Sequence, residues 1–122
     1  MTEPRTQAEL DAERSVIGAV LAAGSLDVAA GHRTLERAIA TVLDPAHFYG
    51  ASSGNLYARM LVLHERGLPL DPVSIAYELE RDGAEPDVIG RLRQLAYEVT
   101  AISPVARWAE IVAKAGRTRT AA

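Results

Sequence analysis

The sequence contains no cysteine, which excludes disulfide bonds, thiolate metal sites and cysteine nucleophiles. Aromatic residues make up only 5% of the chain, so the signals for β-strands are few. No apolar run approaches the length of a membrane span, and the N-terminus lacks the apolar centre of a signal peptide. We therefore expect a soluble, cytoplasmic protein whose fold depends on one hydrophobic core.

Nucleotide-binding and catalytic motifs are also missing. The chain has neither Gly-x-x-x-x-Gly-Lys-Ser/Thr nor Gly-x-Gly-x-x-Gly, the two glycine-rich loops that hold phosphates. His32, His47 and His64 lie far apart in sequence, and for His47 and His64 we favour packing or hydrogen bonding over metal binding. Acidic residues occupy every second position in one expected helix: Glu78, Glu80 and Asp82. Side chains two residues apart do not face each other on a helix, so this pattern is typical of a solvated face. We expect no catalytic, cofactor-binding or metal-binding residue.

The charge balance argues against a domain that coats nucleic acid. At 122 residues, 48% of them hydrophobic, the chain is long enough for one globular domain. Its formal net charge is −3, whereas nucleic-acid-binding domains are usually basic. The basic residues near the C-terminus are Lys114, Arg117 and Arg119. Direct nucleic-acid binding by this domain alone is therefore not expected.

Helical periodicity begins near the N-terminus. Thr6 followed by Glu9 is typical of a capping box, and Gly24 predicts the end of this first helix. Residues 25–33 have the character of a loop. A second helix should end at Asp44-Pro45, because the residue before a proline avoids the helical conformation. Its expected apolar face consists of Leu35, Ala38, Ile39 and Val42.

The third and fourth helices are separated by a short turn. Ser52 or Ser53 can cap the third helix, and Gly67 should end it. This helix is apolar over a wide arc, so we expect it to be central in the fold. Asp71 followed by Pro72 predicts the start of the fourth helix, because aspartate caps and proline suits the first helical position.

Two further helices complete the chain. Residues 85–87 place acids at the start of a fifth helix, and residues 103–104 precede a sixth. We predict an all-α fold, a compact bundle of about six helices. Residues 1–5 should be disordered, residues 6–102 should form the globular domain, and residues 103–122 should form a C-terminal helix that frays from Gly116. The expected core contains Ile17, Gly18, Leu21, Phe48, Tyr49, Leu56, Met60, Leu63 and Leu79.

Several stretches together resemble the N-terminal domain of DnaB-type replicative DNA helicases. Residues 13–21 and 78–83 are similar to helices of that family. Pro-Ala-His-Phe-Tyr at 45–49 is similar to the family's Pro-x-x-Phe-Tyr, and Gly-Leu-Pro-Leu-Asp at 67–71 to its Gly-x-Pro-apolar-Asp. Trp-Ala-Glu-Ile-Val at 108–112 stands where the family has Tyr-Ala-x-Ile-Val. A longer connection over residues 22–34 and a poor match at 89–93 depart from the pattern.

The resemblance implies a non-catalytic module of DNA replication. In that family the domain forms a collar on a hexameric ring, helical hairpins pair the subunits, and the collar docks the C-terminal domain of primase. Residues 103–122 resemble the start of the hairpin. The implied partners are a second copy of the chain and either primase or the replicative helicase, with no cofactor and no membrane. Candidate interface residues are Trp108, Val105, Val112, Arg91, Arg93 and Arg107.

Other hypotheses remain open from the sequence. As part of a longer protein, the chain would belong to an ATP-dependent DNA helicase; as a free-standing protein, it would regulate a host helicase or primase. A small helical DNA-binding regulator is a third hypothesis, because the third and fourth helices could form a helix-turn-helix. An incomplete hairpin would leave the apolar side of the last helix uncovered, which favours self-association.

Overall fold

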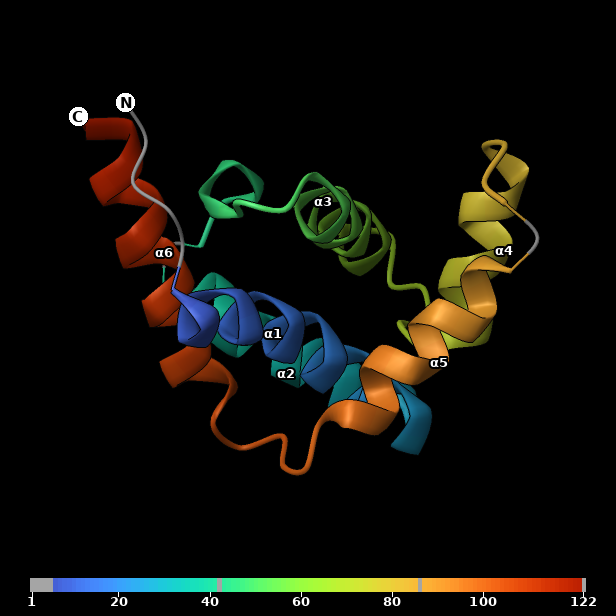
Figure 1. Ribbon diagram of the computed structural model, residues 1–122. Coiled ribbons are helices and arrows are strands. Elements are labelled where there is room, and N and C mark those ends of the chain that lie inside the picture. The colour runs from blue at the N-terminus through green and yellow to red at the C-terminus, as the bar shows by residue number, and fades with distance from the viewer. Residues whose placement is uncertain (1–5, 42, 86, 122) are drawn as a thin grey trace.

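The fold is entirely helical over the residues that the computed structural model describes, which are 6–41, 43–85 and 87–121. Within these ranges there are six α-helices, one 3-10 turn and no strand, so the predicted all-α class is confirmed (Figure 1). The expectation of disorder at residues 1–5 lies outside the described residues. The elements are α1 (Gln7–Leu26), α2 (Val28–Ile39), η1 (Pro45–His47), α3 (Ala51–Glu65), α4 (Pro72–Arg81), α5 (Val88–Glu98) and α6 (Val105–Ala121).

Helix α1 is the centre of the fold. It begins with the predicted capping box, in which the Thr6 hydroxyl accepts from the Glu9 N–H at 3.1 Å. All six residues from Val16 to Leu21 are buried, so the middle of α1 is enclosed on every side. It contacts α2, α3, α4, α5 and α6. The expectation that the third helix is central is therefore wrong, because the small residues of α1 let neighbouring helices approach from all directions.

The connection between α1 and α2 is shorter than expected. Helix α1 continues past Gly24 to Leu26, and the Asp27 carboxylate caps α2 by accepting from the Ala30 N–H at 2.7 Å. A Cβ at Gly24 would lie 2.8 Å from the carbonyl group of Leu70, so this glycine serves close packing and not a helix stop. The loop predicted for residues 25–33 is wrong. Helix α2 ends at Ile39, and Val42 lies outside the described residues.

The start of α3 is fixed by a residue from another helix. Neither Ser52 nor Ser53 caps it, since both lie inside the helix, and its N-cap Gly50 has no capping side chain. The Glu13 carboxylate of α1 instead accepts from the N–H groups of Tyr49 at 2.8 Å and Gly50 at 3.1 Å. The bond to Gly50 satisfies the N-cap donor, which a helix start leaves unpaired, and the bond to Tyr49 fixes the residue just before it.

Local signals set the boundaries of α4 and the end of α3. Gly67, just past α3, has φ 69°, a left-handed conformation that suits glycine. The Asp71 carboxylate accepts from the N–H groups of Val73 and Ser74, and Pro72 is the first residue of α4, as predicted. Helix α5 follows α4 and packs against both α4 and α1.

Helix α6 belongs to the core. Val105, Ala109 and Val112 are fully buried against the rest of the domain, and α6 packs on α1, α2 and η1. The expectation that its apolar side is uncovered is therefore wrong. The helix also continues past Gly116 to Ala121, where we expected an irregular tail. One guanidinium nitrogen of Arg119 donates to the Ala46 carbonyl at 3.1 Å, which holds the end of α6 against η1.

Most residues expected in the core are buried. Ile17, Gly18, Leu21, Phe48, Met60 and Leu63 are buried, whereas Leu56 and Leu79 are only partly so. Tyr49 is 54% exposed and is not a core residue, because its ring faces the Arg119 guanidinium at 5.8 Å.

Tyr57 is the aromatic side chain that fills the core beside Phe48. The two rings lie 5.2 Å apart, and the Tyr57 hydroxyl donates to the Leu43 carbonyl at 3.0 Å. Burial, with a smaller contribution from the Asp44 charge, raises the pKa of Tyr57 to about 12. In the described part of the chain, no helix has the length and apolar character needed to cross a membrane.

Candidate protein-interaction surface

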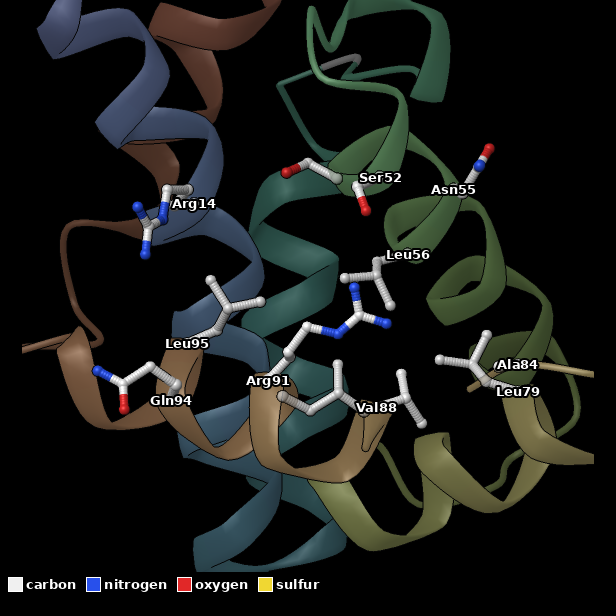
Figure 2. Close-up of a pocket in the computed structure, with 12 residues that line it drawn as sticks. Arg14, Ser52, Asn55, Leu56, Leu79, Ala84, Val88, Arg91, Gln94 and Leu95 are labelled. Carbon is white, nitrogen blue, oxygen red and sulfur yellow. The ribbon is translucent and has the colours of Figure 1, made fainter. Parts of the chain in front are cut away.

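A groove between α3 and α5 has a mainly apolar lining. Its volume is about 450 Å³, and α1, α3, α4 and α5 all contribute residues to it (Figure 2). We call it the α3–α5 groove. Its apolar floor is formed by Leu56, Leu79, Ala84, Val88, Leu92 and Leu95.

Helical spacing on α5 produces one side of this floor. Val88, Leu92 and Leu95 recur at intervals of four and three residues, so they lie on one face of the helix. Leu56 of α3 and Leu79 of α4 lie across from them. These two leucines are only partly buried because they line the groove as well as packing on the core.

Polar and cationic side chains surround the apolar floor. Arg14 of α1 lies at one side and forms an ion pair with Glu98 of α5. Arg91 extends from α5 over the groove (Figure 2), and no hydrogen bond or ion pair to a residue of the described ranges holds its guanidinium group. Asn55 and Gln94 add neutral polar groups to the lining. The groove therefore combines apolar area with one cation that lacks a partner within the described residues.

The predicted interface residues do not form one surface. Arg91 lines the α3–α5 groove, whereas Arg93 lines a separate pocket beside Gly24 and Asp71. Arg107 lies on α6 and pairs with Glu110 at 3.4 Å. Helices α5 and α6 lie on different sides of α1 (Figure 1), so the three arginines are not gathered on one helix surface.

The apolar members of the predicted interface are also placed differently. Val105 and Val112 are fully buried within this chain, so their assignment as partner contacts is wrong. The cause is the packing of α6 on α1, which uses the same apolar face. Trp108 is partly exposed and packs against the edge of the core, so part of its ring remains open to solvent.

Two histidines that are distant in sequence meet in the fold. His32 of α2 and His64 of α3 approach with 2.6 Å between their Nδ1 atoms, and His32 Nε2 lies 2.9 Å from the Leu68 carbonyl. That carbonyl can only accept, so His32 donates from Nε2, and when the His32 ring is neutral its Nδ1 accepts from His64. Glu36 lies 3.7 Å from His64 Nε2. Among the described residues no group of three or more histidine or acidic side chains is arranged to hold a metal ion.

The charges on α4 give no support to a recognition helix for DNA. Arg81 forms an ion pair with Glu78 at 3.9 Å, and Asp82 pairs with Arg59 of α3. The cations near this helix are therefore already paired with acids. An acidic face of this kind is repelled by phosphate groups.

Comparison with known proteins places this geometry in a family. The family model for the DnaB-like helicase N-terminal domain matches residues 5–114, which includes at least part of every helix. The crystal structure of the N-terminal domain of DnaB helicase from Mycobacterium tuberculosis is similar, with a TM-score of 0.75 and 30% sequence identity. The match covers 95% of this chain and 77% of that chain.

Proposed function

Because this chain belongs to the family of DnaB-like helicase N-terminal domains, we propose that it is a non-catalytic protein–protein interaction module of DNA replication. The observation that carries the proposal is the family match over residues 5–114, supported by the similar fold of the mycobacterial domain. The sequence also lacks a phosphate-binding loop. ATP hydrolysis would therefore belong to another domain or to another protein.

The C-terminal domain of primase is the partner we propose. The resemblance of this sequence to the helicase collar implies this partner, and the α3–α5 groove offers a partly apolar surface for protein contact. The net charge of −3 and the paired charges on α4 favour a protein partner over DNA. If the chain acts as a free-standing regulator, the same surface would bind the host helicase or primase.

Calorimetric titration with the primase C-terminal domain from the same organism tests this proposal. We expect saturable binding with a defined stoichiometry. Duplex DNA of random sequence, titrated under the same salt conditions, is the matched comparison and should give no saturable heat. Binding to the replicative helicase without binding to primase would support the free-standing regulator. Salt-dependent binding to duplex DNA alone would contradict the interaction-module proposal.

Self-association is a separate part of the proposal. The family's helical hairpins pair subunits, and α6 resembles the start of that hairpin. Trp108 and Ile111 are the partly buried apolar residues that α6 could present to a second copy. Sedimentation equilibrium should show a mass above that of the monomer, and Trp108→Ala should lower it. A monomeric mass at every concentration measured would contradict self-association of this chain.

A further inference from the structure

We propose that the α3–α5 groove docks an amphipathic helix of a partner protein, which places apolar side chains on the groove floor and a carboxylate against Arg91. The inference rests on the proposed role of the chain as an interaction module and adds the site, the shape of the occupant and its charge. It depends on three observations: an apolar floor, a cation without a partner in the described residues, and walls made of helices.

The apolar floor defines the side chains that the occupant must carry. Val88, Leu92 and Leu95 form a row along α5 that extends over about 10 Å, which is two helical turns. Leu56 and Leu79 face this row from α3 and α4, and both keep part of their surface outside the core. Within this floor Val88 and Leu92 are already buried, so the apolar surface still open to water belongs mainly to Leu95, Leu56 and Leu79. Apolar side chains at intervals of three and four residues on a docked helix would cover that surface and remove it from water.

The cation defines the charge of the occupant. Arg14 is already neutralised by Glu98, so it adds little attraction for an incoming anion. Arg91 has no such partner among the described residues, and its guanidinium group lies over the apolar floor (Figure 2). A carboxylate on the occupant would form a charge-assisted hydrogen bond with Arg91 at a place where the docked helix excludes water.

The walls of the groove favour a helix over an extended segment. The backbone N–H and C=O groups of α3 and α5 are bonded within their own helices. An extended segment lying between them would find no backbone partners, and its own polar groups would lose water without compensation. A helix brings its backbone hydrogen bonds with it, as in the known helix-in-groove complexes.

The first experiment is a selection from a displayed library of random peptides of about 16 residues, long enough to form a helix on binding. The full chain is the target. We expect enriched peptides to carry apolar residues at helical spacing together with an aspartate or glutamate. Their binding, followed by fluorescence anisotropy, should weaken about tenfold or more in Arg91→Glu. Peptides with lysine in place of the acid should bind Arg91→Glu better than they bind the natural chain.

Matched variants separate this site from general charge effects. Arg93→Glu makes the same charge change on the same helix but outside the groove, so it should leave peptide binding unchanged. Arg91→Lys keeps the charge and should retain part of the affinity. Both arginines are exposed, and circular dichroism should confirm that every variant keeps its helical content.

Several outcomes would overturn the inference. They are a selection without enriched binders, enriched peptides without acids, and peptides that bind Arg91→Glu as tightly as the natural chain. Binding of dodecanoate in the groove without any peptide binder would identify a small amphipathic anion as the occupant instead. The primase titration is independent of these results. Peptide binding at the groove without primase binding would leave the inference standing and remove the proposed partner, whereas primase binding together with a selection that yields no binder at the groove would keep the partner and remove the inference.

Discussion

At the scale of single residues, the buried carboxylate of Glu13 has the strictest need for hydrogen-bond partners. It is a carboxylate with only 2% of its surface exposed, and it lies among the apolar residues of α1. Its two oxygens accept from the N–H groups of Tyr49 and Gly50, which lie immediately before α3. A buried carboxylate is tolerated only when such bonds replace its hydration. Glu13 therefore determines where the chain enters α3 relative to α1.

Replacement of Glu13 by glutamine should destabilise the domain. The amide keeps the size of the side chain but has one acceptor oxygen, so one of the two backbone N–H groups loses its partner. We expect a loss of about 1.5–3 kcal/mol in the free energy of unfolding, measured by urea denaturation. Glu80→Gln, which changes an exposed glutamate of α4, should stay within about 0.5 kcal/mol of the natural chain. Equal effects of the two substitutions would show that the Glu13 bonds contribute nothing specific.

Tyr57 should make stability depend on pH in the alkaline range. The unfolded chain releases the phenol proton near the ordinary pKa of 10.0, whereas burial and Asp44 raise the pKa of folded Tyr57 to about 12. Between these values the unfolded state binds fewer protons than the folded state, so the free energy of unfolding falls as pH rises. The contribution is fully present below pH 10.0 and is lost by about pH 12.

The difference in the free energy of unfolding between the natural chain and Tyr57→Phe isolates this contribution. Below pH 10.0 the variant should be less stable by about 0.5–1.5 kcal/mol, because it lacks the bond to the Leu43 carbonyl. Above that pH the natural chain should lose on the order of 2 kcal/mol relative to the variant, measured by urea denaturation at a series of pH values. Parallel profiles for the two proteins would contradict the raised pKa.

At the scale of helices, boundaries set by adjacent residues could be predicted and boundaries set by distant ones could not. The Thr6–Glu9 and Asp71–Pro72 caps act within three residues, so the sequence alone indicates them. The start of α3 depends on Glu13, which lies 36 positions before Tyr49. For α2 the local signal was present in Asp27, but Gly31 follows it inside the helix, and glycine ordinarily disfavours a helical interior.

The packing of α1 on α5 should depend on the absence of a side chain at Gly18. A Cβ at this position would lie 2.4 Å from the Leu95 carbonyl oxygen and from a Val99 methyl group. Gly18→Ala should therefore destabilise the domain by about 1–3 kcal/mol, although alanine is the better helix former. Gly90→Ala on α5 is the matched control, because its Cβ would meet nothing within 4 Å. That variant should gain about 0.4–1 kcal/mol in chemical denaturation. Stabilisation by both substitutions would mean that α1 and α5 do not approach this closely.

At the scale of the whole molecule, the helix patterns in the sequence do not predict the α3–α5 groove. The apolar spacing predicts Leu56 and Leu79 as core residues, whereas Arg91 is a candidate for an interface only as an exposed residue of the fifth helix. They come together only because α3, α4 and α5 converge beside α1. The burial of α6 could not be predicted for the same reason. Its apolar face was recognised, but a helical pattern does not say whether the surface that covers it comes from this chain or from a second copy.

The burial of α6 predicts that the chain folds as one cooperative unit. A variant ending at residue 102 removes Val105, Ala109, Val112 and Ala113 from the core and exposes the surfaces of α1 and α2 that they cover. Each buried valine contributes about 1.5–3 kcal/mol, and the surfaces newly exposed to water add to the loss. Against a total stability of about 5–15 kcal/mol, this loss should abolish cooperative unfolding and lower the helical signal by more than the removed residues account for. A variant ending at Arg119 keeps the anchor on the Ala46 carbonyl and should unfold much like the natural chain. Circular dichroism during urea denaturation distinguishes the two, and a sharp transition in the shorter variant would instead establish residues 103–122 as a separate appendage.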